Sequence, residues 1–172
     1  METDIRPALD EDAPILAALG AETFIATFGR LYDEKDLNTF LAKSHSAETY
    51  AAFLRNPDYG LWLAISPQGE AIGYAVAGPC GLPVPNCPDN AGELMRLYLK
   101  QGVQGGGIGA RLLETALEFL RDRFNNIYLS VYAENTGAQR LYQRFGFVKI
   151  HEHFYMVGDH ADPDWIMELK HG

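Results

Sequence analysis

The sequence predicts an α/β fold, and three stretches carry that prediction. Residues 93–113, ELMRLYLKQGVQGGGIGARLL, indicate an apolar strand, a glycine-rich turn and the start of an amphipathic helix. Before them, Leu61–Ile65 and Ala71–Ala77 are apolar runs on either side of a polar turn, which predicts an antiparallel hairpin. After them come a strand over 127–131 and a short helix over 135–145. Strands and helices therefore alternate along the chain, as they do in an α/β domain.

The glycine-rich turn is the first candidate for a binding site. Gly105, Gly106, Gly107 and Gly109 place four residues without side chains where the predicted helix begins. Glycine permits unusual backbone angles and lets a ligand approach backbone N–H groups closely. The first N–H groups of a helix have no intrahelical partner, and the positive end of the helix dipole lies there. Such a position binds phosphate without needing a basic side chain.

The helix that follows is amphipathic. Its apolar residues recur at spacings of three and four, which places them on one face. Charged residues, among them Glu114 and Glu118, fall on the opposite face. We expect the apolar face to pack against the sheet. The stripe consists of Ile108, Leu112, Leu113, Ala116, Leu117 and Leu120.

Three kinds of phosphate ligand are candidates for this turn. A nucleoside triphosphate loop needs Lys and Ser or Thr after its last glycine, but Gly109 is followed by Ala110 and an arginine. A dinucleotide fingerprint fits as Gly105-x-Gly107-x-x-Ala110, with Glu134 further along. That stretch lies in the middle of the chain, however, and too few strand–helix units follow it to build the usual dinucleotide-binding sheet. Coenzyme A is the third candidate.

Length and charge restrict the class of protein. We expect one domain over residues 1–172, large enough for a single core. The formal net charge of −9 disfavours a nucleic-acid-binding surface and is compatible with a cationic substrate. No signal peptide is visible, and no apolar run approaches the ~18 residues that a membrane span needs. We therefore expect a cytoplasmic protein without nucleic-acid or membrane partners.

We expect no disulfide and no metal site. Cys80 and Cys87 both lie in a proline-rich segment, and a reducing compartment would keep them as thiols. His151 and His153 share one face of a predicted strand, and His160 follows, but no further fixed ligand completes a metal site.

The remaining elements are expected from apolar runs, caps and turns. The first strand covers residues 5–8, and a helix capped by Asp10 follows and ends at Gly20 or Gly29. Residues 78–92 form a long proline-rich loop, and a connection of this length is often functional. The other ranges are helices over 33–43 and 46–55, a strand from 147, a turn over 160–164 and a closing strand over 165–169.

Two motifs give the chain a family resemblance. The Q-x-x-G-x-G run that begins at Gln104 resembles the acyl-CoA loop of the GNAT N-acetyltransferase superfamily. About thirty residues later, the N-x-x-A-x-x-x-Y-x-x-x-G-F segment that begins at Asn135 and contains Tyr142 resembles the second motif of these enzymes. The resemblance extends over most of the chain from Leu61 onward.

The resemblance implies a GNAT fold and an acetyl-CoA site. The fold is a mixed, largely antiparallel sheet with helices on both faces, in which two central strands splay apart near Tyr98 and Val131. The pantetheine arm fills the gap, the pyrophosphate lies on the glycine-rich turn, and Asn135 bonds the arm from the other side. The implied cofactor-binding residues are Leu97, Tyr98, Leu99, Gln104, Gly105, Gly106, Gly107, Ile108, Gly109, Ala110 and Asn135.

The implied reaction is direct attack of a primary amine on the thioester of acetyl-CoA in a ternary complex. An alkylamine is mostly protonated at neutral pH, so a base or a water held by a base must accept its proton. Glu93 is our candidate base, because family members often have a water-binding glutamate at the start of this strand. Tyr142 is our candidate acid for the departing thiolate. The backbone N–H of Leu97 or Leu99 is expected to stabilise the oxyanion.

The C-terminal segment points to a class of acceptor. The run from His153 to Asp159, followed by D-W-I-M from Asp164, resembles the end of bacterial spermidine/spermine N-acetyltransferases, although Asp162 and Pro163 depart from it. A polyamine is therefore the leading acceptor, while an exposed turn remains the alternative interpretation of these aspartates. A non-catalytic acyl-CoA sensor and a dinucleotide-binding enzyme are the alternative functions. Many relatives pair as homodimers, so we also keep a homodimer as possible.

Overall fold

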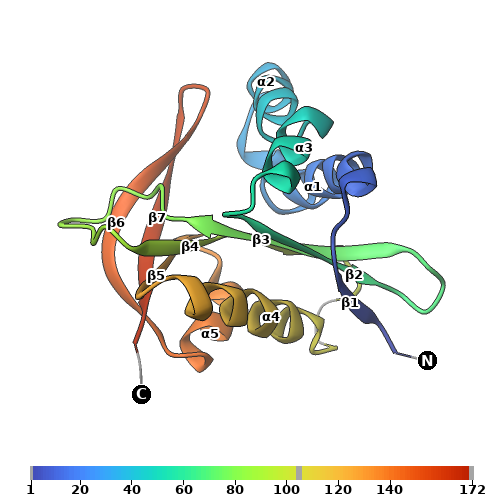
Figure 1. Cartoon of the computed structure of the whole chain (residues 1–172). Helices are drawn as coiled ribbons and strands as arrows, with labels where there is room; N and C mark the ends of the chain where they lie inside the picture. The colour runs from blue at the N-terminus through green and yellow to red at the C-terminus, as the bar shows by residue number, and fades with distance from the viewer. Residues whose placement is uncertain (1, 104–105, 171–172) are drawn as a thin grey trace.

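The computed structural model describes residues 2–103 and 106–170 and shows a seven-stranded sheet between two helical layers (Figure 1). The strand order is β1-β2-β3-β4-β5-β7-β6. Helices α1, α2 and α3 lie on one face, and α4 and α5 lie on the other. The strands are β1 Asp4–Pro7, β2 Gly60–Ile65, β3 Ala71–Pro79, β4 Ala91–Leu99, β5 Asn126–Tyr132, β6 Phe147–Val157 and β7 His160–Leu169. The helices are α1 Ala13–Phe28, α2 Glu34–Ser44, α3 Ala47–Arg55, α4 Ile108–Arg123 and α5 Thr136–Arg144.

The expected mixed, largely antiparallel sheet is confirmed. All neighbouring strands pair antiparallel except β4 and β5, which pair in parallel. The parallel pairing joins Ala91–Leu94 only to Asn126–Leu129. Beyond these residues the two strands diverge, so the splay begins several residues earlier on β4 than the sequence predicted. A β-bulge on the β3–β4 pair, between Leu94 and Arg96, accompanies the divergence.

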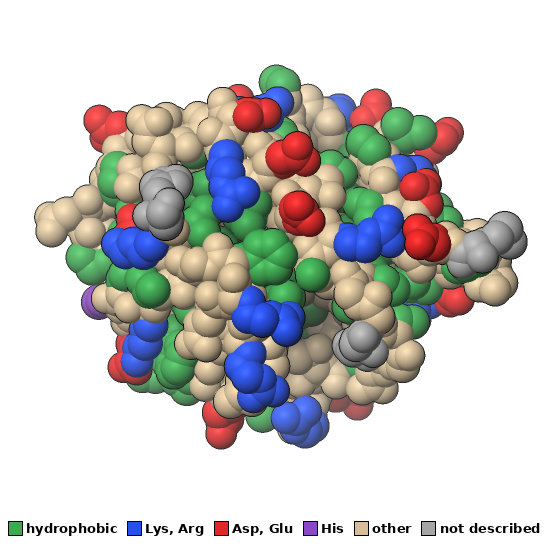
Figure 2. Space-filling view, turned by 90° about the horizontal axis from the view of Figure 1, so that it is seen from below, with side chains coloured by type: hydrophobic (Ala, Val, Ile, Leu, Met, Phe, Trp, Pro, Cys, Tyr) green, Lys and Arg blue, Asp and Glu red, His purple; other side chains and the backbone are tan. Residues whose placement is uncertain are grey.

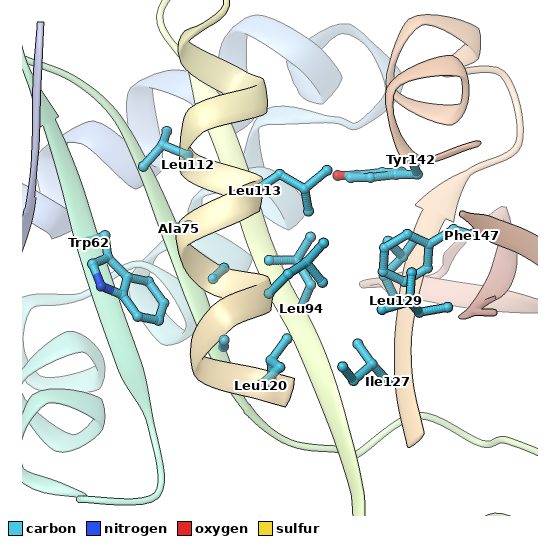
Figure 3. Close-up of a cluster of buried hydrophobic side chains, with 14 of the residues drawn as sticks. Trp62, Ala75, Leu94, Leu112, Leu113, Leu120, Ile127, Leu129, Tyr142 and Phe147 are labelled. Carbon is cyan, nitrogen blue, oxygen red and sulfur yellow. The ribbon is translucent and has the colours of Figure 1, made fainter. Parts of the chain in front are cut away.

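The main core lies between the sheet and α4 (Figure 3). The predicted apolar stripe of α4 is buried along its whole length, from Ile108 to Leu120. It packs on side chains of the central strands, including Leu94, Leu129 and Ala75. Burying a large aliphatic side chain contributes about 1.5–3 kcal/mol, so this stripe fixes α4, and with it the glycine-rich turn, against the sheet.

A second core lies on the opposite face, between the sheet and helices α1 and α3. Leu16 and Tyr50 of the helices pack on Leu63 and Tyr74 of the strands. The side chain of Ser46 accepts a hydrogen bond from the Thr49 N–H, so it caps α3 as the sequence predicted. This layer supplies the wall that faces the open end of β4.

The start of the first helix differs from the prediction. Asp10 does not cap it; Asp10–Asp12 form a short 3₁₀ turn, and α1 begins at Ala13. The carboxylate of Asp12 accepts a hydrogen bond from the Leu9 N–H at 2.7 Å and pairs with Arg6, which fixes the turn. Gly20 does not end α1 either, because it lies inside the helix where a β-carbon would come within 2.4 Å of the Tyr50 hydroxyl.

The predicted turn over residues 160–164 is wrong, and the predicted loop over residues 78–92 is too long. Strand β7 already begins at His160, and the turn lies at residues 158–159, where Gly158 adopts a left-handed φ of 58°. Pro163 is tolerated because it lies beyond the last β5–β7 pair, where its carbonyl accepts from the Ala133 N–H. Strands β3 and β4 extend into the loop, which leaves residues 80–90 as the connection.

Candidate active site

A cleft of about 760 Å³ opens where β4 and β5 diverge. Both helical layers and the strands β4, β5, β6 and β7 contribute residues to its walls. Its floor is formed by β4 from Glu93 to Leu99. From α4 and α5 it is lined by Gly109, Ala110, Gly137, Ala138, Leu141, Tyr142 and Arg144, and from the opposite layer by Phe24, Thr27, Phe28, Tyr32, Phe40 and His45.

The N-terminus of α4 forms one end of the cleft. Gly107 caps the helix with a left-handed φ of 80°, which favours glycine, and a β-carbon there would meet no neighbour within 4 Å. Gly107, Gly109 and Ala110 line the cleft, so the backbone at the start of α4 is open to a ligand. Of the predicted phosphate-binding residues, Gln104 and Gly105 lie outside the described residues.

Basic side chains gather on the face of the molecule that α4 and α5 cover (Figure 2). The exposed arginines of these two helices are Arg111, Arg121, Arg123, Arg140 and Arg144, and Arg144 also lines the cleft. Exposed Glu114, Glu118 and Asp122 of α4 lie on the same face, so the arginines outnumber the carboxylates there without forming a purely basic surface. Arg144 lies at the cleft, where its positive charge favours an anionic ligand.

Tyr142 projects from α5 into the cleft. Its side chain is 7% exposed and packs edge-on against Phe147, with ring centroids 6.0 Å apart. Its hydroxyl points toward α4 (Figure 3). Burial raises the pKa of this phenol well above its usual value, so the hydroxyl is protonated at neutral pH. The residue can therefore donate a proton or a hydrogen bond to a group in the cleft.

Asn135 stands at the turn between β5 and α5. Its side-chain oxygen accepts a hydrogen bond from the Ala138 N–H at 3.2 Å, which caps α5, and the residue lines the cleft. Gln139, which the sequence analysis did not single out, is buried behind it and donates to the carbonyl oxygens of Tyr132 and Ala133. These bonds fix the turn that carries both Asn135 and the Tyr142 helix.

Glu93 lies on the other side of the cleft, at the third position of β4. It is 9% exposed, and its Oε1 accepts a hydrogen bond from the Gly81 N–H at 3.0 Å. Burial raises the pKa of this carboxyl to about 7, against the opposing effects of the Gly81 bond and the Arg96 charge. A carboxyl with this pKa exchanges protons readily at neutral pH. The loop that supplies Gly81 also contributes Leu82 to the cleft wall.

The sequence analysis did not identify Arg96, because nothing in the neighbouring sequence indicates which groups an arginine within an apolar strand contacts. Its guanidinium donates to the Ser44 carbonyl at 2.8 Å and to the Tyr50 hydroxyl at 2.7 Å. The guanidinium also lies 5.2 Å from the centre of the Tyr50 ring. Burial and the Arg96 charge lower the pKa of His45 to about 3, so this cleft histidine is neutral. Arg96 thus joins the α2–α3 connection to the floor of the cleft.

Two aspartates of β7 complete the acidic side of the cleft. Asp162 and Asp164 are 3% and 9% exposed, so the alternative that placed them in an exposed turn is wrong, while Asp159 is exposed. The Tyr32 hydroxyl donates a hydrogen bond to Oδ2 of Asp162. Nδ1 of His160 lies 2.7 Å from Oδ1 of Asp162, but the two atoms are not aligned as a hydrogen bond. Burial, reinforced by the Asp162 charge, raises the pKa of Asp164 to about 6.

Aromatic rings line the same cleft as these carboxylates. Phe24 packs on Phe40 with ring centroids 4.7 Å apart, and Tyr32 stacks on Phe24 at 6.0 Å. Phe40 also meets Tyr155 of β6 edge-on. We call Phe24, Phe28, Tyr32, Phe40 and Tyr155 the aromatic wall of the cleft.

Within residues 2–103 and 106–170, no group of three or more His, Cys, Asp and Glu side chains is arranged to hold a metal ion. Cys80 and Cys87 are both free thiols. None of the described helices is long and apolar enough to cross a membrane.

Comparison with known proteins decides the family. The model of the acetyltransferase (GNAT) family matches residues 26–147, which include β4, the glycine-rich turn and Tyr142. The chain belongs to the GNAT acetyltransferase family. It is therefore an N-acetyltransferase, and the matched segment includes both β4 and β5, between which the cleft opens.

Relatives of the chain carry the same activity in their names. An uncharacterized N-acetyltransferase of Lactobacillus delbrueckii subsp. lactis is 26% identical over 92% of both chains. The spermine/spermidine N(1)-acetyltransferase of Bacillus subtilis is 33% identical, but over only 46% of this chain and 54% of its own length. The fold matches the crystal structure of a PaiA N-acetyltransferase from Thermoplasma acidophilum in complex with coenzyme A, with a TM-score of 0.78 and 24% identity over 99% and 100% of the two chains.

Proposed function

We propose that the whole chain, residues 1–172, is one domain that transfers the acetyl group of acetyl-CoA to a primary amine. The pyrophosphate of acetyl-CoA lies at the start of α4, on the N–H groups of residues 104–109. The pantetheine arm lies between the diverging strands, beside Leu97–Leu99 on β4 and Asn135 on α5. Support comes from the cleft, which joins the N-terminus of α4 to Tyr142, and from the coenzyme A bound by the Thermoplasma structure of the same fold.

The acceptor that we propose is a small cationic amine, with a polyamine such as spermidine or spermine as the leading candidate. One observation carries this choice: Glu93, Asp162 and Asp164 are all buried carboxyl groups that line the cleft opposite the cofactor side. Buried carboxylates with aromatic neighbours attract alkylammonium groups by charge and by cation–π contact. The partial likeness to the Bacillus spermine/spermidine enzyme points the same way.

The proposed reaction is direct attack within a ternary complex. Glu93, or a water that it holds, takes the proton that the amine loses during the attack. The backbone N–H of Leu97 or Leu99 stabilises the oxyanion. Tyr142 gives its proton to the departing thiolate of coenzyme A. No metal enters this scheme.

The experiment that tests the proposal measures free thiol released from acetyl-CoA with a panel of amines. The panel contains spermidine, spermine, a diamine, a lysine-containing peptide and an amino acid, and mass spectrometry identifies the acetylated product. We expect the polyamines to give the highest kcat/KM. Preference for the peptide or the amino acid would refute the polyamine assignment, and thiol release without any acetylated amine would refute the transfer itself.

The two alternatives make different predictions in the same assays. A non-catalytic acyl-CoA sensor would be stabilised by acetyl-CoA but would release no thiol with any amine. A dinucleotide-binding enzyme would be stabilised by NAD or NADP rather than by acetyl-CoA, because a ligand raises the melting temperature only of the protein that binds it.

We also propose a homodimer in the cytoplasm. Strand β6 is an edge of the sheet and exposes Phe154, Tyr155 and Met156. Edge strands with exposed apolar side chains are places where copies of a protein pair. Light scattering of the purified protein tests this, and a monomer at micromolar concentration would contradict it.

A further inference from the structure

Ser130 is the first residue of β5 beyond the last pair with β4, so it stands where the two strands diverge. Its hydroxyl lies 2.8 Å from Oδ2 of Asp164 on β7 and 2.9 Å from Nε2 of His153 on β6. Asp164 and His153 also face each other across the β6–β7 ladder. Three side chains from three neighbouring strands therefore form one hydrogen-bonded row across the sheet.

The two ends of this row face different surroundings. Asp164 is 9% exposed and lines the cleft, as Ser130 does. His153 does not line the cleft; it is partly exposed, on the edge strand of the sheet. The row thus connects the acceptor side of the cleft to the outer surface of β6 through one hydroxyl.

The proton balance of amine acetylation sends one proton per turnover to solvent. An alkylammonium nitrogen loses two protons on its way to a secondary amide: one before it attacks the thioester and one during the attack. The thiolate of coenzyme A takes up one proton when it leaves as a thiol. One proton per turnover must therefore leave the active site for solvent.

We propose that Asp164, Ser130 and His153 conduct this proton from the incoming ammonium group to solvent. The inference rests on the proposed function, and it gives Asp164 the proton lost before the attack, whereas Glu93 takes the proton lost during the attack. The two buried carboxyl groups then have separate tasks.

The transfer follows from the hydrogen-bonding capacity of a hydroxyl group. While Asp164 is ionised, Ser130 donates to its Oδ2. Because this uses the only Ser130 proton, His153 at rest donates its Nε2–H to the Ser130 oxygen. Once the carboxylate has taken a proton from the ammonium group, exchange with water moves the imidazole proton from Nε2 to Nδ1, the hydroxyl turns to the free Nε2, and Asp164 donates to the Ser130 oxygen. The Asp164 proton then passes to the hydroxyl as the hydroxyl proton passes to Nε2, and release of the Nδ1 proton to water restores the starting arrangement.

Burial acts on the two end groups of the row. It raises the pKa of Asp164 to about 6, and burial, with the nearby His151, lowers the pKa of His153 below its usual value. The imidazole of His153 is therefore neutral at pH 7.5 and able to take up a proton. The other titratable groups whose charges bear on Asp164 and His153, or that neighbour Asp164, are Asp162, Tyr32, Tyr98, Tyr155 and His151.

Two variants interrupt the row at different points. Ser130→Ala removes the hydroxyl, and His153→Ala removes the final acceptor but leaves a space that opens toward solvent. His151→Ala is the matched control, because His151 lies two residues earlier on the same strand and is exposed. The measured quantity is the single-turnover rate of spermidine acetylation at pH 7.5 in weak buffer, with wild-type turnover established first.

We expect both row variants to lose about tenfold or more in this rate, as removal of an acid–base group does, while the control keeps the wild-type rate. Added imidazole should restore His153→Ala, because a small base can accept the proton at the vacated position. Raising the pH should restore Ser130→Ala, since the amine then arrives already neutral. A merely structural role for these residues would show neither form of rescue.

Unchanged rates in both row variants overturn the proposal, and so does a loss that neither imidazole nor higher pH reverses. If His153→Ala does not fold, His153→Gln replaces it with the same expected loss but without rescue, and a wild-type rate in that variant is equally contradictory. A wild-type enzyme that forms no acetylated amine would instead refute the proposed function itself.

Discussion

At the scale of single residues, the cleft separates groups that give protons from groups that take them. Tyr142 lies on the α5 side in an apolar setting that keeps its hydroxyl protonated. Glu93 and Asp164 lie on the opposite side, and burial raises the pKa of each into the range of neutral pH. The same physical cause, loss of solvation, thus prepares an acid on one side and two proton acceptors on the other.

The first residue-scale prediction concerns Tyr142. Tyr142→Phe removes the hydroxyl and keeps the ring that packs on Phe147. We expect kcat to fall ~10²–10⁴-fold because the thiolate loses its proton donor, while the thermal shift produced by acetyl-CoA stays unchanged. Steady-state thiol release and thermal melting are the two measurements. A variant that keeps the wild-type kcat would remove Tyr142 from the chemistry.

The second residue-scale prediction concerns the pH dependence of activity. With a Glu93 pKa of about 7, the wild-type rate should rise as pH increases through 7, because only the ionised carboxyl accepts a proton. Glu93→Gln keeps an oxygen for the Gly81 N–H but cannot accept a proton, so this limb of the pH–rate profile should disappear along with most of the rate. An undiminished kcat/KM across the pH range would refute the role of Glu93.

The same carboxyl group also affects stability, and we expect stability to fall over the pH range in which activity rises. The unfolded chain ionises Glu93 near 4.5 and the folded chain near 7, so this residue costs stability as pH rises through that window. Relative to low pH, the wild type should lose about 3 kcal/mol of unfolding free energy through this group. Urea unfolding at pH 4.5 and pH 8 measures the loss. Glu93→Gln should show a smaller loss, and an equal loss in both proteins would contradict the assigned pKa.

At the scale of elements, the position of α4 determines where a phosphate can bind. The apolar stripe from Ile108 to Leu120 fixes the helix on the sheet, and Gly107 turns the chain into it with a φ of 80°. A residue with a β-carbon at that φ is strained. Packing of the apolar stripe therefore fixes the position of the helix N-terminus, and Gly107 allows the backbone angle with which the chain enters it.

Gly107→Ala tests this arrangement. We expect it to lower the unfolding free energy by about 1–2 kcal/mol, the strain of a left-handed alanine, and to weaken acetyl-CoA binding measured by calorimetry. Gly69→Ala is the matched control, since Gly69 has a φ of 84° in the β2–β3 turn with open space around it. The control should lose similar stability and keep wild-type affinity. Equal affinity in both variants would exclude a contact between the cofactor and this turn.

The sequence predicted those elements whose signal is local. The stripe of α4 and the Ser46 cap follow from spacing over a few residues, and the structure confirms both. The burial of Asp162 and Asp164 was missed because it depends on how far β6 and β7 extend as a hairpin, which short-range turn signals around Pro163 misrepresent. Arg96 was missed for a related reason, since its partners lie 46 and 52 residues away along the chain.

At the scale of the whole molecule, the sheet brings two functional halves together at one point. The helical layer of α4 and α5 supplies a helix N-terminus and exposed arginines (Figures 1 and 2). The opposite layer supplies most of the aromatic wall, and strands β4 and β7 supply the carboxyl groups that face it. The cleft between β4 and β5 connects the halves through the sheet. A thioester carrier can therefore enter from one face and an amine from the other, which is the geometry that a ternary complex needs.

The most direct test of this account is a crystal structure with coenzyme A bound. We expect the pyrophosphate at the start of α4, the pantetheine between β4 and β5, and the sulfur within about 3.5 Å of the Tyr142 hydroxyl, close enough for a hydrogen bond to sulfur. An empty β4–β5 cleft, or a sulfur atom far from that hydroxyl, would contradict the account.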